Sequence, residues 1–130
     1  MSKDLKALSS WVRQLRHRAK KHNLFNSLSI SEIQEVIDHT NGKCCLCDAD
    51  YTVLDVAFPL KDGAPNVQAN VIILCAACKG LKRNENLLYL VSNDLISKPI
   101  FTNILKLCFS RNHGDILVSH VKALSGNSDD

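Results

Sequence analysis

Aromatic side chains are scarce in this sequence. Its 130 residues include one Trp and two Tyr. Proteins that hold single-stranded nucleic acids stack successive bases on such rings, so their scarcity argues against a single-stranded partner. Long apolar runs are also missing: no stretch approaches the ~20 residues of a membrane-spanning helix, and the first residues lack the apolar core of a signal peptide. We therefore expect a soluble, cytoplasmic protein whose cysteine thiols stay reduced.

Acidic residues are nearly absent from the first 23 positions. This stretch holds seven Lys or Arg against Asp4 alone, a net charge of +6, whereas the rest of the chain has a net charge of −3. Its apolar residues recur at three- and four-residue spacing, which predicts an amphipathic helix: they are Leu5, Leu8, Trp11 or Val12, Leu15 and Ala19. The opposite, charged face predicts contacts with nucleic-acid phosphates, by Lys6, Arg13, Arg16 and Lys20. A charged face that is simply hydrated is an alternative of about equal weight.

Four of the six cysteines form two pairs with the same internal spacing. Cys44 and Cys47 make the first pair, and Cys75 and Cys78 make the second. Two residues between a pair of thiolates let both bind one ion, and two such pairs complete a tetrahedral shell. The spacing therefore predicts a structural Zn²⁺ site. Cys45 is an alternative to Cys44 as ligand, although the two-residue spacer favours Cys44.

The pattern around these pairs predicts short helices and two strands. Ser29 to Glu32 has the sequence of a capping box and begins a helix that ends at Asn41–Gly42. Residues 51–57 and 71–74 are predicted strands, separated by a turn-rich loop. A single helix, with Leu81, Leu87, Leu88 and Val91 on its buried face, is expected to follow and to stop at Lys98–Pro99. Another helix is expected around residues 101–108, and residues 115–124 fit a helix or, around Ile116–Val118, a strand.

Together these features predict an α+β fold, mainly helical, with a small zinc-stapled ββα core between N-terminal and C-terminal helices. The expected divisions are a basic amphipathic arm (1–28), a zinc-binding domain (29–98), a C-terminal helical extension (99–124) and a disordered tail (125–130). The stretch from Leu87 to Leu124 is more apolar than a small domain needs. It therefore packs beneath the core or forms an interface with a partner or a second copy, and the sequence leaves both open.

The order of helix, cysteine pair, strand, loop, strand, cysteine pair and helix resembles the HNH endonuclease family, whose ββα-metal motif is often framed by zinc knuckles. The segment from Leu54 to Leu60 is similar to the family's first strand, with Asp, His, two apolar residues, Pro and Leu. The segment from Asn70 to Cys75 is similar to its Asn-Leu-x-x-Leu-Cys. The resemblance covers about half of the chain and implies a phage or bacterial type.

The resemblance also shows which catalytic groups are changed. It places Asp55 at the first ligand of the catalytic metal and Asn70 at the residue that orients the first-strand loop. Val56 stands where the family has its general-base His, and Lys79 where it has a second metal ligand. A valine accepts no proton and an ammonium repels a cation, so catalytic Mg²⁺ is not expected. Enzymatic activity stays uncertain, with a protein that is not an enzyme favoured, and Lys79 is expected to pair with Asp55 or to meet a phosphate.

Three functions follow as hypotheses. The first is a catalytically inactive module that binds duplex DNA, with Lys79, Lys82 and Arg83 joining the N-terminal cations at phosphates, and that serves as a regulator in a phage or mobile element. The second is a protein-binding regulator or inhibitor that uses the apolar C-terminal helices, including a homodimer. The third is an active endonuclease or nickase whose general base is displaced, with His39, His113 and His120 as candidates.

Overall fold

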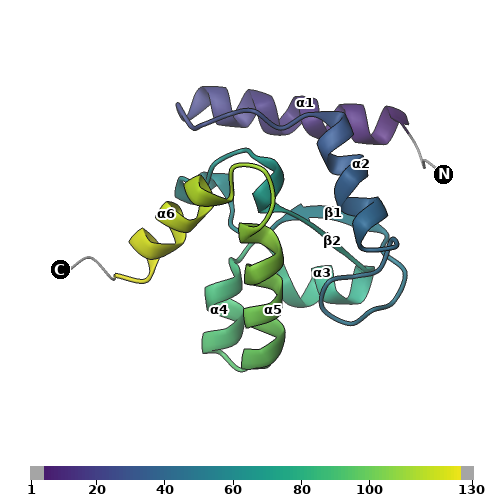
Figure 1. Ribbon diagram of the computed structural model, residues 1–130, viewed down its shortest axis with the longest axis vertical. Coiled ribbons are helices and arrows are strands. Elements are labelled where there is room, and N and C mark those ends of the chain that lie inside the picture. The colour runs from purple at the N-terminus through teal and green to yellow at the C-terminus, as the bar shows by residue number, and fades with distance from the viewer. Residues whose placement is uncertain (1–4, 127–130) are drawn as a thin grey trace.

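A two-stranded antiparallel sheet lies at the centre of the computed structural model, which describes residues 5–126. Strand β1 (Val53–Val56) pairs with β2 (Val71–Leu74), and Asp55 stands opposite Ile72 in the register. The segment between the strands contains two short 3₁₀ turns, Leu60–Asp62 and Gln68–Asn70. Six helices among the described residues surround the sheet (Figure 1), so the expected α+β, mainly helical class is confirmed.

Both faces of β2 are buried, which explains its unbroken apolar sequence. Val71 and Ile73 belong to one buried cluster, together with residues of α1 and α2. Ile72 and Leu74 point to the other face and belong to a second cluster. Because successive residues of a strand point to opposite faces, β2 separates two apolar layers and all four of its side chains are buried. The predicted boundaries of this strand are confirmed.

The N-terminal helix α1 (Leu5–Lys21) packs its apolar stripe on the sheet and α2. Leu8, Val12, Leu15 and Ala19 are buried, in one cluster with Ile33 of α2. The opposite face is exposed and contains no acid in the first turn. The predicted amphipathic helix is therefore confirmed, and its apolar face is part of the core. Figure 1 shows the helix lying along one side of the molecule.

Helix α2 (Ile30–His39) begins at the predicted capping box. Ser29 Oγ accepts a hydrogen bond from Glu32 N at 3.3 Å, and Glu32 Oε1 accepts one from Ser29 N at 3.0 Å. The helix ends where Asn41 and Gly42 adopt positive φ angles of 54° and 66°. Gly42 N donates to Ile37 O at 2.9 Å, a bond that satisfies one of the last helical carbonyls.

The helical region after the second cysteine pair differs from the prediction in two places. The single expected helix is two helices, α3 (Ala76–Lys82) and α4 (Leu87–Ser92). Arg83 leaves the helical conformation with φ 54° and ψ −132°, and the Asn86 side chain then caps α4 by accepting from Tyr89 N at 2.8 Å. Lys98–Pro99 was also expected to stop a helix, and it begins one instead. Pro is well tolerated in the first turn, where its missing N–H would have no helical partner.

The last two helices are α5 (Lys98–Phe109) and α6 (Gly114–Leu124). Residues 116–118 are therefore helical, which decides between the helix and the strand that the sequence left open. Ser97 Oγ caps α5 by accepting from Ile100 N at 3.2 Å. Of the expected tail, Ser125 caps α6 through its backbone and residues 127–130 lie outside the described part of the chain. None of the helices in residues 5–126 is long and apolar enough to cross a membrane.

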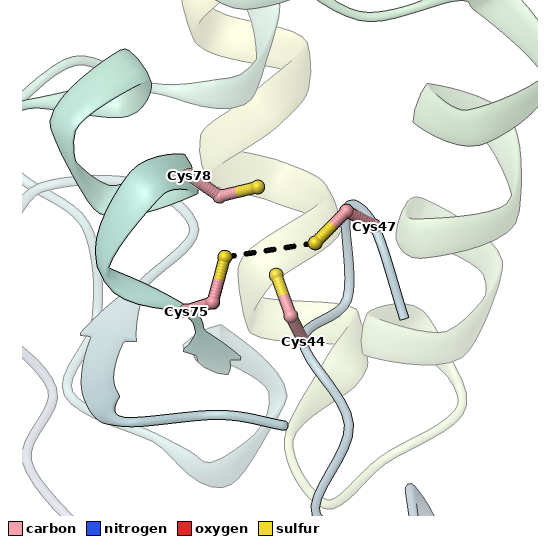
Figure 2. A group of neighbouring side chains, drawn as sticks. All are labelled: Cys44, Cys47, Cys75 and Cys78. Atoms are coloured by element: carbon pink, nitrogen blue, oxygen red, sulfur yellow. Dashed lines mark hydrogen bonds between the residues drawn. The ribbon is translucent and has the colours of Figure 1, made fainter. Parts of the chain in front are cut away.

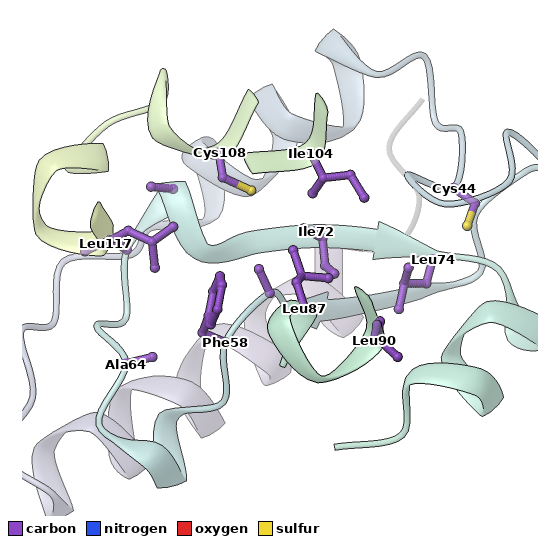
Figure 3. Packing of buried hydrophobic residues seen from close by; sticks show 13 residues of the cluster. Cys44, Phe58, Ala64, Ile72, Leu74, Leu87, Leu90, Ile104, Cys108 and Leu117 are labelled. Atoms are coloured by element: carbon purple, nitrogen blue, oxygen red, sulfur yellow. The ribbon is translucent and has the colours of Figure 1, made fainter. Parts of the chain in front are cut away.

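The second buried cluster joins the C-terminal helices to the sheet (Figure 3). Ile104, Cys108 and Leu117 are buried with Phe58 and Ile72. At the junction of α5 and α6, Arg111 Nη1 donates to Val71 O at 2.8 Å, so a side chain from the C-terminal segment also bonds to the backbone where β2 begins. Part of the apolar excess of this region is thus packed beneath the core, while Leu95, Leu107 and Leu124 are exposed.

Candidate metal centre and the adjoining cleft

The first cysteine pair lies in a tight loop that is attached to the end of the sheet. Cys44 N donates to Ala49 O at 2.6 Å and Asp48, with φ 69°, donates its N–H to Cys44 O at 3.0 Å. Cys45 N donates to Ile73 O at 3.0 Å. That bond brings the loop to the end of β2, where Cys75 follows directly in the sequence.

The second pair lies at the start of α3. Cys75 is the N-cap residue, and Cys78 lies in the first turn. Residues three apart on a helix share a face, so both thiols point toward the first loop. The two pairs therefore approach each other from a loop and from a helix start, as Figure 2 shows.

The four sulfur atoms form a cluster of the right size for a tetrahedral metal ion. All four Sγ atoms lie within 4.8 Å of one another, and Cys47 Sγ and Cys75 Sγ are 3.6 Å apart. A Zn–S bond of ~2.3 Å in tetrahedral geometry places sulfur atoms ~3.8 Å apart. The donor set and its spacing fit zinc, and the predicted four-cysteine cluster, able to bind a metal such as zinc, is confirmed.

The remaining cysteines are outside this cluster. Cys44, and not Cys45, supplies the fourth sulfur. Burial raises the pKa of the Cys45 thiol to about 12, and the pKa of the buried Cys108 thiol to about 11. Cys108 belongs to the buried apolar cluster that contains Ile72 and Leu74, and Cys45 packs against that cluster.

The Asp55 carboxylate, on β1, lies between two lysine ammonium groups of α3. Asp55 Oδ2 is 3.1 Å from Lys79 Nζ and 3.2 Å from Lys82 Nζ. The other oxygen, Oδ1, accepts a hydrogen bond from Val56 N at 2.8 Å. Lys79 Nζ also donates to Arg83 O at 3.1 Å. The expected pairing of Lys79 with Asp55 is confirmed, and this carboxylate has two cations beside it.

Lys82 requires a correction. It was expected on the surface among the phosphate contacts, with Leu81 on the buried face of the helix. Instead 1 % of Lys82 is exposed and 39 % of Leu81 is. Burial lowers the pKa of Lys82, while the charge of Asp55 acts to raise it. The signal that was overlooked is spacing: Lys79 and Lys82 are three residues apart, so a helix places both on the face that meets Asp55.

The side chain of Asn70 forms hydrogen bonds with the backbone of the loop that follows β1. This side chain is fully buried, accepts from Phe58 N at 2.8 Å and donates to Phe58 O at 2.8 Å. It also donates to Pro65 O at 3.3 Å. These three bonds fix the backbone just after Val56. Val56 itself packs partly buried against the apolar cluster of α1 and α2.

A cleft opens beside Asp55, between α1, the end of β1 and the end of α3. Its cavity volume is about 370 Å³. The buried Lys82–Asp55 pair lies on its floor, and the exposed side chains of Arg18, His22 and Lys61 line it nearer the solvent. Among the lining residues that the structure describes, three are cationic and one is a carboxylate, which leaves the cleft with a net charge of +2 before any charge on His22.

The histidines proposed as a displaced base lie elsewhere. His39 is exposed on α2, and Ser27 Oγ is 3.2 Å from His113 Nδ1. His120 packs its ring against Phe58, with centroids 6.1 Å apart. None of the three lines the cleft, whereas His22 does. His22 follows directly after α1 and its N–H donates to Arg18 O at 3.2 Å, so its spacing from Arg18 was the available signal.

The other residues expected at nucleic acid are exposed. Lys6, Arg13, Arg16 and Lys20 all lie on the solvent side of α1, and Arg83 is exposed at the end of α3. A comparison of the chain with models of known protein families and with curated proteins found no match.

Proposed function

We propose that this chain is a zinc-stabilised, catalytically inactive module with the ββα arrangement of the HNH endonucleases, and that it binds duplex DNA. The four-cysteine cluster supports the zinc, since its sulfur spacing suits that ion. When bound, Zn²⁺ would join the first loop to α3 and contribute to folding. A regulatory role in a phage or mobile element would use such a docking surface without cleavage.

The observation that carries the loss of catalysis is the arrangement of Asp55, Lys79 and Lys82. Both ammonium groups lie within 3.2 Å of the carboxylate oxygen that would bind a divalent metal. A cation there meets repulsion from two fixed charges, and Lys82 is buried beside the carboxylate. Restoring His at Val56 and Asn at Lys79 would leave Lys82 in place, so that double variant should still not bind Mg²⁺.

The support for DNA is the exposed face of α1. Its cations lie on the side opposite the buried stripe, and the described part of the helix contains no acid. A helix that is only hydrated commonly mixes charge signs in pairs four residues apart. A row of one sign instead suits the phosphates of DNA, where binding releases counterions and weakens as salt rises.

The first test is a plasmid assay. Purified, zinc-loaded protein is mixed with supercoiled plasmid in Mg²⁺, in Mn²⁺ and without added divalent metal. We expect retarded bands that return to supercoiled form after the protein is removed. Metal-dependent nicked or linear product would contradict the proposal and favour an active nickase, with His22 as the first base to substitute. Neither retardation nor cutting would favour the protein-binding alternative, and the molar mass in solution would then show whether a homodimer forms.

The second test is a pair of matched triple variants. One replaces Arg13, Arg16 and Lys20 on α1 by Gln. The control replaces three exposed lysines of the C-terminal helices by Gln, namely Lys98, Lys106 and Lys122. Both variants lose three positive charges, so a difference in their DNA affinity shows that the position of the charges matters and not only their number. If the three α1 cations contact phosphates, the slope of log affinity against log salt concentration falls by ~2.7 in the α1 variant. Equal slopes in the two variants would remove α1 from the interface.

A further inference from the structure

The cleft beside Asp55 continues onto the surface of α1. Arg18 and His22 line the cleft, and the same two residues line a shallow depression with Gln14, His17 and Lys21. The depression lies along the C-terminal half of α1, and the cations that line it are Arg18 and Lys21. A strand that follows these cations is therefore led to the mouth of the cleft.

The floor of the cleft includes the buried cation Lys82. An ammonium group has three N–H donors, and Lys82 Nζ has one partner, Asp55, among the described residues. That carboxylate is shared with Lys79, so one negative charge stands against two positive ones. Arg18 and Lys61 add two more cations nearer the solvent. A buried cation that is only partly compensated is costly, and an anion in the cleft would compensate it.

The dimensions of the cleft limit what can enter. About 370 Å³ is near the lower end of the volumes of small-ligand sites, which begin at roughly 300 Å³. A duplex is far too large, whereas a phosphate group at the end of a strand fits. Such a monoester carries a charge of about −1.5 to −2 at neutral pH, which suits the net +2 of the lining better than the single charge of a phosphodiester.

We propose that this cleft binds the terminal phosphate monoester of a DNA strand, so that the protein prefers phosphorylated DNA ends. The proposal rests on the DNA binding proposed above and adds to it a specific place for the end of the strand. Lys82, Arg18 and Lys61 supply the charge, His22 and Asn84 supply further polar groups at the rim, and no divalent metal takes part.

The test compares four DNA probes of one sequence: a duplex with 5′-phosphates, one with 3′-phosphates, one with hydroxyl groups at all ends, and a closed circle. Affinity is measured without divalent metal at fixed salt. We expect at least one phosphorylated duplex to bind on the order of tenfold more tightly than the hydroxyl duplex, as for one charge-assisted hydrogen bond. Arg18→Gln and Lys61→Gln should each reduce that preference. Lys20→Gln, also exposed on α1 but outside the cleft lining, should weaken all probes alike and keep the preference.

The possible failures are distinguishable. Equal affinity for all four probes would overturn the end site and leave the DNA-binding proposal standing. No affinity for any probe would overturn both. A titration with inorganic phosphate, followed by NMR shifts of the His22 ring, identifies the source of the anion: shifts without a preference for phosphorylated ends would mean that the cleft holds a free phosphate and that the DNA-end proposal is wrong.

Discussion

Replacing Asp55 by Asn should destabilise the protein strongly, because it leaves Lys82 charged and buried. The substitution is nearly isosteric, and an Asn oxygen can still accept the hydrogen bond from Val56 N that Asp55 Oδ1 accepts at 2.8 Å. What changes is the charge that faces the two ammonium groups. Lys79 has a third of its side chain exposed and can turn to water, whereas 1 % of the Lys82 side chain is exposed.

The magnitude follows from that burial. Removing one partner of a buried ion pair typically costs ~3–5 kcal/mol. Asp55 keeps 12 % of its side chain exposed and borders the open cleft, so the lower end applies, about 3 kcal/mol, or roughly 10 °C in Tm. Lys82→Met fills the same space without a charge and leaves Asp55 paired with Lys79, so its effect should stay within ~1 kcal/mol of zero. The double variant should recover most of the loss.

Urea unfolding of the zinc-loaded protein measures these differences, and pH adds a second check. Burial lowers the pKa of Lys82 below its usual 10.5, so the folded state binds this proton less tightly than the unfolded chain. The charge of Asp55 opposes that lowering of the pKa and Asp55→Asn removes it, so the free energy of unfolding of the variant should rise, relative to the parent protein, as pH increases toward 10.5. The matched control is Asp50→Asn, which breaks the shorter but exposed pair with Lys43 at 2.7 Å. If the control is as destabilising as Asp55→Asn, the argument from burial is wrong.

Three other predictions concern the metal centre and the core. Cys75→Ser should abolish tight binding of one zinc ion per chain and largely unfold the protein, because the binding free energy of structural zinc is folding free energy; a chelator titration and circular dichroism measure both. Cys45→Ser should keep the zinc stoichiometry, since Cys45 lies outside the sulfur cluster, and a loss of zinc would show that it is a ligand. Burial lowers the pKa of His120 below its usual 6.5, so the folded state takes up this proton less readily and the free energy of unfolding should fall as pH drops below about 6.5. His120→Gln should reduce that fall and His39→Gln, an exposed control on α2, should not; equal curves for all three proteins would contradict the assignment.

Local signals in the sequence were sufficient for much of the fold. The capping box at Ser29 and Glu32 placed the start of α2, because both of its hydrogen bonds connect residues three apart. The spacing within each cysteine pair is also local, and the two pairs, 28 positions apart, were joined by the four thiolates that one tetrahedral ion needs. The apolar run of β2 was recognisable because both of its faces are buried.

Features that depend on neighbours distant in sequence were missed. The spacing of Lys79 and Lys82 places both on one face of α3, but the burial of Lys82 beside Asp55, 27 positions earlier, follows only once α3 packs against β1. The break between α3 and α4 depends on Arg83 taking a positive φ, which is uncommon for a residue other than Gly. The prediction that a helix stops at Pro99 was wrong because proline is common both just after helices and in their first turn. Its role depends on the Ser97 cap before it, which favours a beginning.

The hydrogen bond from Arg111 to the backbone of Val71 determines which segment of this protein can be transferred to another protein in a folded state. A segment ending near residue 98 would contain both strands and all four cysteines, and by these features alone it would be taken for a complete folding unit. It would lack the guanidinium that bonds to the start of β2 and the side chains of Ile104 and Leu117 that cover the sheet. A fusion that transfers this module to another protein must therefore include the C-terminal helices, through the end of α6, together with the cysteine loops.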